Sequence, residues 1–228
     1  MIQKKYLAII PARKGSKGLP NKNILPFLGV PLFLNTYNIL KSSKYEIDIY
    51  VSTDSEEIIS ICNEEKINFI KRPREISNDN STTEDAIIHL LNSLKLADHD
   101  NLILAQCTSP LLNSSDVDSI LDSFESKMEI IDSLFTCYED HIPIWTRENN
   151  KLQRVNHSEE VRQPRQKSKS VFVENGAFYV FKINKFIHLK NRFCGVTDNF
   201  IMPKTKSIDI DTYEDFQLAE LIKKYINV

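Results

Sequence analysis

The sequence predicts an α/β fold, a Rossmann-like three-layer sandwich with a mainly parallel sheet and a small additional subdomain. Apolar segments of strand length alternate along the chain with longer segments of helical periodicity, an order that is typical of βαβ units. The apolar segments contain few polar residues, as expected for parallel strands that are buried on both faces. The length of 228 residues exceeds the roughly 150 residues of an average domain, so we expect one domain with an appendage.

Six short apolar runs are predicted to be strands, at residues 6–11, 47–52, 67–71, 101–106, 132–138 and 172–181. The predicted helices alternate with them, at residues 31–42, 55–66, 83–96 and 116–127 and after Thr212 near the C-terminus. In the helix at 83–96, Ile87, Leu90 and Leu94 fall on one stripe, which is the pattern of a helix packed on a core. The two serines before Asp116 and the hydroxyl of Thr212 can cap helices.

Residues 139–170 interrupt this alternation. The segment is polar, contains Pro143 and Pro164, and shows no long periodicity. We therefore predict a small insertion at 139–170, with a C-terminal limit between 170 and about 195, and an α/β domain formed by 1–138 and 171–228.

Composition and charge exclude several classes of protein. The net charge of −2 argues against a general nucleic-acid binder, which needs a broad basic surface. No apolar run approaches the roughly 18 residues of a membrane span, so no membrane partner is expected. The four cysteines lie 45, 30 and 57 positions apart, which matches no zinc or CxxC spacing and favours reduced thiols in a cytoplasmic protein.

A basic loop follows the first predicted strand directly. Residues 8–23 hold two glycines and four cations, Arg13, Lys14, Lys17 and Lys22. Loops after strand ends form the ligand crevice of an open α/β sheet, and glycines allow backbone N–H groups to approach phosphates. The spacing is neither that of a Walker A loop nor GxGxxG. The alternative interpretation is a solvated basic turn.

An acidic pair lies near the C-terminus. Asp209 and Asp211 are two residues apart on an extended segment, so both carboxylates point to one face, as a hard divalent cation requires. The alternative is that one of them caps the following helix, although Thr212 and Ser207 offer that function too. An Asp-x-Asp pair also occurs in many glycosyltransferases and does not by itself distinguish sugar transfer from sugar activation.

Seven motifs together resemble the acylneuraminate cytidylyltransferases, also called CMP-sialic acid synthetases. They are AIIPARKGSKGLPNKN (8–23), STD (52–54), RP (72–73), QCTSP (106–110), RQPRQ (162–166), ENGAFYVF (174–181) and SIDIDTYEDF (207–216), in order and over nearly the whole chain. The resemblance implies a domain of the nucleotide-diphospho-sugar transferase type and a small domain that forms a homodimer. It also implies Mg²⁺-dependent transfer of CMP from CTP to the anomeric 2-hydroxyl of a nine-carbon 2-keto sugar acid, with release of pyrophosphate. Mn²⁺ is an alternative ion.

The same resemblance assigns the nucleotide site. It implies nucleotide-binding roles for Ala12, Arg13, Ser16, Lys17, Asn23, Arg72, Thr82 and Gln106. Arg13, Lys17 and Asp211 are the implied catalytic residues, and Asp209 and Asp211 the implied metal ligands. Asn23 resembles the reader of the cytosine, with a turn or cap as its alternative role. For Arg72 the alternative is a solvated loop charge.

The implied sugar-acid site is formed by Gln106, Thr108, Ser109, Trp145, Arg165, Gln166, Asn175, Tyr179 and Phe193. Trp145 stands where some N-acetylneuraminate enzymes carry a lysine, and it favours a less hydroxylated acceptor of the legionaminate or pseudaminate kind. Phe193 resembles an aromatic residue that such dimers donate to the neighbouring site, with ordinary packing as its alternative. No histidine is assigned a catalytic role.

Two alternative functions remain at this point. One is a 3-deoxy-manno-octulosonate cytidylyltransferase, which uses an eight-carbon acid in the same reaction. The other is a nucleotide-binding regulatory protein without turnover, for which a damaged basic loop or acidic pair would be expected.

Overall fold

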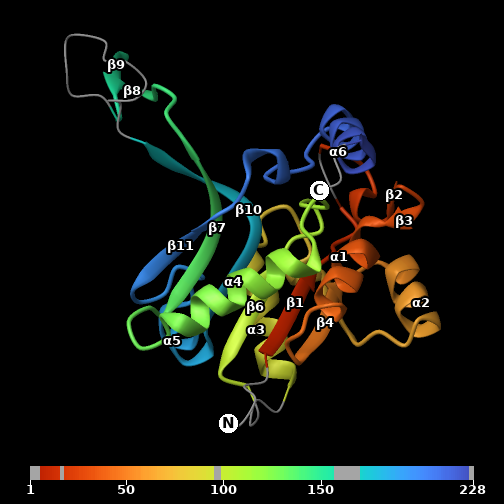
Figure 1. The fold of residues 1–228 in the computed structure, drawn as a ribbon. Coiled ribbons are helices and arrows are strands. Elements are labelled where there is room, and N and C mark those ends of the chain that lie inside the picture. The colour runs from red at the N-terminus through yellow and green to blue at the C-terminus, as the bar shows by residue number, and fades with distance from the viewer. Residues whose placement is uncertain (1–5, 16–17, 95–98, 157–169, 226–228) are drawn as a thin grey trace.

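A seven-stranded sheet forms the centre of the molecule in the computed structural model, which describes residues 6–15, 18–94, 99–156 and 170–225 (Figure 1). Its strands are β1 (Tyr6–Pro11), β4 (Ile47–Thr53), β5 (Phe69–Lys71), β6 (Asn101–Ala105), β7 (Ser133–Asp140), β10 (Val171–Lys182) and β11 (Thr197–Ile201). The strand order is β11-β7-β10-β6-β1-β4-β5. Only β10 is antiparallel to its neighbours, β6 and β7. The predicted mainly parallel sheet is confirmed.

Helices cover both faces of this sheet. They are α1 (Leu32–Lys41), α2 (Glu56–Glu64), α3 (Thr83–Ser93), α4 (Ser114–Ser126), α5 (Ile183–Leu189) and α6 (Tyr213–Tyr225). Alternate residues of β1 belong to two separate cores. Tyr6, Ala8 and Ile10 pack with α1, α2, α4 and α6, whereas Leu7 and Ile9 pack with α3 and α5. Strands buried on both faces explain the near-continuous apolar runs and confirm the three layers.

Side-chain caps fix where several helices begin. Thr82 and Asp85 form a reciprocal capping box at α3, and Thr212 with Asp215 does so at α6, as predicted for Thr212. At α4 the prediction was wrong in detail. Asn113, not a serine, accepts the hydrogen bond from the Asp116 N–H, and the helix starts at Ser114.

β7 and β10 continue beyond the sheet and lead to a projecting hairpin of β8 (Trp145–Glu148) and β9 (Lys151–Arg154) (Figure 1). We call the described residues 141–156 the arm; they fall within the predicted insertion. Asn149 and Asn150 both have positive φ, 48° and 61°, as a tight hairpin turn requires. The sequence prediction missed this hairpin, together with β11 and α5.

Smaller elements complete the chain. A two-stranded ribbon joins β2 (Pro26–Phe27) to β3 (Val30–Pro31), and 3₁₀ turns lie at Lys22–Ile24, Arg74–Ile76 and Lys204–Lys206. Within the described part of the chain, no helix is long and apolar enough to cross a lipid bilayer.

Candidate active site

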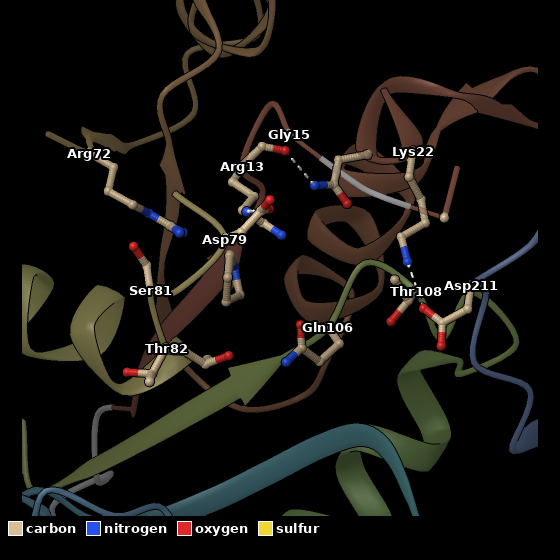
Figure 2. Close-up of a pocket in the computed structure, with 14 residues that line it drawn as sticks. Arg13, Gly15, Lys22, Arg72, Asp79, Ser81, Thr82, Gln106, Thr108 and Asp211 are labelled. Atoms are coloured by element: carbon tan, nitrogen blue, oxygen red, sulfur yellow. Dashed lines mark hydrogen bonds and ion pairs between the residues drawn. The ribbon is translucent and has the colours of Figure 1, made fainter. Parts of the chain in front are cut away.

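A cavity of about 360 Å³ opens beside the carboxyl ends of β1 and β6 (Figure 2). Its walls come from the loop after β1, the segment after β5, the loop before α3, the turn after β6 and the segment before α6. They are lined by Pro11, Arg13, Gly15, Gly18, Lys22, Asn23, Arg72, Asp79, Ser81, Thr82, Thr83, Gln106, Thr108 and Asp211. The position agrees with the crevice expected for an open α/β sheet.

The cavity gathers many of the residues that the sequence singled out. Arg13, Asn23, Arg72, Thr82, Gln106, Thr108 and Asp211 all line it. Ala12 is buried next to it, and its N–H donates to the carbonyl of Ser52 at 2.9 Å. Ser16 and Lys17 lie outside the described residues.

Arg13 projects from the end of β1 and forms an ion pair with Asp79, with 3.1 Å between Nη1 and Oδ1. The following N–H, of Lys14, donates to Oδ1 of Asp54 at 2.8 Å. The bond from Lys14 to Asp54 connects the basic loop to the end of β4. The ion pair of Arg13 with Asp79 brings the loop before α3 against Arg13, so two walls of the cavity meet at this arginine (Figure 2).

Arg72 is the buried cation of the site. Only 5% of its surface is exposed, so the alternative of a solvated loop charge is wrong. Its Nε and Nη2 donate to Oγ and the carbonyl oxygen of Ser52, at 3.1 and 3.0 Å. Burial lowers its pKa, and the charge of Arg13 acts in the same direction, against the opposing charge of Asp54. A guanidinium held by neutral acceptors keeps its positive charge available for an anion.

Asn23 is 9% exposed, and its Nδ2 donates to the carbonyl oxygen of Arg13 at 3.0 Å. The amide therefore holds the basic loop in shape. This hydrogen bond to the loop is the contact expected if Asn23 stabilises a turn. Asn23 also lines the cavity, and its role in binding cytosine stays a prediction.

On the other side of the cavity, hydroxyl groups are already engaged. The Thr82 Oγ1 exchanges hydrogen bonds with Asp85 in the capping box. Thr108 hydrogen-bonds the carboxylate of Asp209 through its side chain, and its carbonyl accepts from the Ile210 N–H at 2.8 Å. Ser109 is buried and does not line the cavity.

Of the acidic pair, Asp211 lines the cavity, whereas Asp209 is not among the lining residues. Ile210 is fully buried, so Asp209 and Asp211 on either side of it turn away from the core. Lys22 binds this segment through Nζ, 3.1 Å from Oδ1 of Asp211 and 2.5 Å from the carbonyl oxygen of Ile210. Loss of hydration raises the pKa of Asp209, and the nearby charge of Asp211 adds to this, against the opposing effects of Thr108 and Lys22.

These carboxylates fit a divalent cation such as Mg²⁺. Hard carboxylate oxygens are its preferred protein ligands, and Mg²⁺ is usually held by one or two carboxylates together with substrate phosphates and water. Among the described residues, no cluster of three or more acidic, histidine or cysteine side chains is arranged to hold a metal. A metal at Asp209 and Asp211 would therefore depend on phosphates to complete its ligands.

The residues implied for the sugar acid are not all at the cavity. Asn175 is buried, with Oδ1 accepting from Thr136 Oγ1 at 2.7 Å and Nδ2 donating to Ser207 Oγ at 3.0 Å. Tyr179 is also buried, and its hydroxyl donates to Glu174. Burial and this acceptor raise the pKa of Tyr179.

Phe193 and Trp145 lie in different surroundings. Phe193 packs edge-to-face on Tyr179 and Phe135 of its own chain, with ring centres 5.9 and 5.5 Å away. Trp145 is on β8 of the arm, 51% exposed, with Arg154 over its ring, and it does not line the cavity. Arg165 and Gln166 lie outside the described residues.

Sequence reasoning gave no individual role to Lys22, Asp79 or Ser81, although all three line the cavity. Lys22 was visible only as one of four cations in the basic loop. Asp79 and Ser81 stand in the polar run NDNST before α3, where caps and turns are the ordinary explanation.

Comparison with known proteins gives a family. A family model described as "Cytidylyltransferase" matches residues 7–225. The chain is 34% identical over 226 residues to the N-acylneuraminate cytidylyltransferase of Streptococcus agalactiae serotype V, a match that covers 93% of this chain and 52% of that protein. It is 29% identical to a pseudaminic acid cytidylyltransferase of Campylobacter jejuni, covering 96% of this chain and 97% of that one. The chain thus spans about half the length of the streptococcal relative.

Solved structures agree on the fold. A CMP:2-keto-3-deoxy-manno-octonic acid synthetase, solved in complex with CTP, superposes with a TM-score of 0.69 at 14% identity, covering 97% of this chain and 99% of the other. The family model includes the basic loop, the segment around Arg72 and the acidic pair. The chain belongs to the cytidylyltransferase family.

Proposed function

We propose that this protein transfers CMP from CTP to the anomeric 2-hydroxyl of a nine-carbon 2-keto sugar acid and releases pyrophosphate. The observation that carries the proposal is the grouping of Arg13, Lys22, the buried Arg72 and the carboxylate of Asp211 around one cavity. CTP brings about four negative charges, and a site for it has to neutralise them.

We expect the cations to neutralise the phosphates of CTP in different ways, according to their positions. Arg13 and Lys22 face the cavity while paired with Asp79 and Asp211, so each can exchange a carboxylate for a phosphate oxygen. Arg72 is held in place by Ser52 and needs no rearrangement to present its charge. We also assign Lys17 to the transferring phosphate. Asn23, anchored to the loop by Nδ2, keeps an amide oxygen for the amino group of cytosine.

We assign Asp209 and Asp211 to Mg²⁺, with Mn²⁺ as the alternative. When bound, the ion neutralises charge on the phosphates and lowers the pKa of a hydroxyl in contact with it. The protein's own part is to hold the two carboxylates beside the phosphate cations, through the bonds of Lys22 to Asp211 and of Thr108 to Asp209. In-line attack of the sugar hydroxyl on the α-phosphate then requires no histidine, and none lines the described cavity.

The nine-carbon class is supported by the relatives named for N-acylneuraminate and pseudaminic acid. The synthetase of the eight-carbon acid that superposes on this chain is 14% identical to it, a likeness that shows the fold alone. Of the nine-carbon acids, Trp145 favours one with few hydroxyl groups, because an exposed indole face packs on acyl or deoxy edges.

We further propose that the protein is a cytoplasmic homodimer joined through the arm. Apolar side chains of the arm and its base are exposed, at Ile142, Trp145, Leu152, Val155 and Phe172. Several exposed apolar side chains on one projecting segment are typical of a protein interface. A partner reached through the arm would bring Trp145 to a cavity that Trp145 does not reach in its own chain. The four buried free thiols suit a reducing compartment.

The test is pyrophosphate release from CTP and Mg²⁺ with a panel of nine-carbon and eight-carbon 2-keto acids. We expect turnover with a nine-carbon acid and little with an eight-carbon one, and a loss of at least about a hundredfold in Asp211→Ala. Glu214→Ala, an exposed acid three residues away, is the matched control. CTP binding without turnover on any acid would instead favour the regulatory protein, and turnover confined to the eight-carbon acid would favour the alternative enzyme.

A further inference from the structure

An ion pair links the nucleotide cavity to the face of β10 that carries Tyr179. Glu84 is the second residue of α3, directly after Thr82 and Thr83, which line the cavity. Arg192 comes from the loop between α5 and β11, 108 positions later in the sequence. Its Nε and Nη2 donate to Oε1 and Oε2 of Glu84, at 2.7 and 3.0 Å.

The ion pair is mostly buried and bidentate. The side chains of Arg192 and Glu84 are mostly buried. Burial alone would raise the pKa of Glu84, but the hydrogen bonds and charge of Arg192 outweigh it and lower that pKa. A bidentate guanidinium–carboxylate pair fixes orientation as well as distance, so it specifies how the α5–β11 loop sits against α3.

Arg192 also carries aromatic residues with it. Its guanidinium lies over the ring of Tyr179, 4.9 Å from the ring centre, within the range of a cation–π contact. The next residue, Phe193, packs on the same ring. The Tyr179 hydroxyl in turn donates to Glu174. One chain of contacts therefore runs from Glu84, which follows the cavity-lining Thr83, through Arg192 to Tyr179 and Phe193.

We propose that Glu84 and Arg192 are positioning residues that hold Tyr179 and Phe193 at a fixed place relative to the start of α3 and thereby set the affinity for the sugar acid. This inference rests on the proposed function, and it takes the acceptor roles of Tyr179 and Phe193 from the resemblance to the acylneuraminate cytidylyltransferases. Neither Glu84 nor Arg192 lines the cavity itself. The pair is therefore expected to act on acceptor binding through the two aromatic rings, with little effect on CTP.

The first experiment separates the two substrates. In Glu84→Gln and Arg192→Met, the KM for the sugar acid should rise about tenfold, while the KM for CTP stays within about twofold. Because the two residues act as a unit, the double variant should be no worse than either single one. Glu57→Gln, at the second position of α2 and exposed, is the matched control and should leave both values unchanged. Equal changes in both KM values, or additive effects in the double variant, would overturn the proposal.

The second experiment needs no turnover. Amide hydrogen exchange of residues 190–195 in the ligand-free protein should become faster in Glu84→Gln than in Glu57→Gln. Unchanged exchange there would show that the pair does not position the loop, whatever the acceptor. If none of the keto acids in the panel makes the unaltered protein release pyrophosphate, the proposed function fails. The hydrogen-exchange measurement would still show whether the ion pair positions the loop.

Discussion

Gly18 lies directly against the backbone of Asp211, so that a Cβ atom at residue 18 would stand 2.3 Å from the Asp211 carbonyl oxygen. No real side chain tolerates that separation from a rigid backbone atom. The basic loop after β1 and the acidic segment before α6 are therefore packed together at a point where only glycine fits, and this contact holds the cations of the loop beside the carboxylate of Asp211.

Gly18→Ala is expected to push the loop away from Asp211 and to lower turnover at least about tenfold, since small displacements of catalytic groups are costly. Gly15→Ala is the matched control. A Cβ at residue 15 meets only the Nη1 of Arg13, at 4.0 Å, so this variant should keep near-normal turnover. Steady-state pyrophosphate release compares them, and equal activities in the two variants would contradict the contact.

Asp209→Asn is expected to inactivate the protein and to stabilise it. The folded-state pKa of Asp209 lies above its ordinary 3.8, so the folded protein binds this proton more tightly than the unfolded chain. The ionised carboxylate therefore destabilises the folded state at neutral pH, and the effect fades as the pH falls through the folded-state pKa toward 3.8.

Thermal unfolding without metal checks this expectation. At pH 7 the amide should raise Tm slightly, because Asp209 is exposed and solvent screens most of the effect. The gain should shrink near pH 4. A lower Tm at pH 7, or a gain that persists in acid, would contradict a raised pKa of Asp209 in the folded state.

Arg72→Lys should raise the KM for CTP about tenfold or more. A lysine cannot donate to both acceptors of Ser52 in the fixed geometry of a guanidinium, and hydrogen bonds of charged groups contribute about 1.5–3 kcal/mol. Arg74→Lys, at an exposed arginine two residues away, should change the KM by less than twofold. Calorimetry can compare the affinity of the two variants for CTP. Equal affinities of Arg72→Lys and Arg74→Lys would contradict the prediction.

Mixing two damaged chains tests whether the arm completes a neighbouring site. In an Arg13→Ala and Trp145→Ala mixture, heterodimers would hold one intact and one doubly damaged site, so about a quarter of the activity should return at equal amounts. Heterodimers without recovered activity would contradict the role of the arm. With Phe193→Ala in place of Trp145→Ala, the contacts of Phe193 with its own Tyr179 predict no recovery, in contrast to the donation implied by the resemblance.

The central fold was predictable because parallel strands that are buried on both faces appear in the sequence as nearly continuous apolar runs. In residues 6–11 and 101–105, alternate side chains pack into the two cores on opposite faces of the sheet. A strand exposed on one face would instead alternate apolar and polar residues. The arm was not, because its strands are exposed and their side chains obey no burial pattern. Only the pair Asn149 and Asn150, both at positive φ, signalled its turn.

The grouping of the candidate residues was predictable in part. Arg13 and Lys22 of the basic loop line one cavity together with Asp211, because loops that follow strand ends open on the same edge of the sheet. Their roles toward a nucleotide stay predictions. Asp79 and Glu84 were not identified, since their partners, Arg13 and Arg192, are distant in sequence, and a carboxylate near a helix start already has an ordinary explanation.

Val171 pairs with Asp140 in the register of β10 on β7, directly below the arm. Two antiparallel strands that end opposite one another can be closed by a two-residue turn. The arm therefore behaves as a removable cassette: the strands on either side of it, β7 and β10, pair with one another up to Asp140 and Val171, and none of its described residues belongs to the buried hydrophobic core. Exchange of this cassette between relatives would alter what the arm meets while the nucleotide cavity, built from other strands, is left untouched.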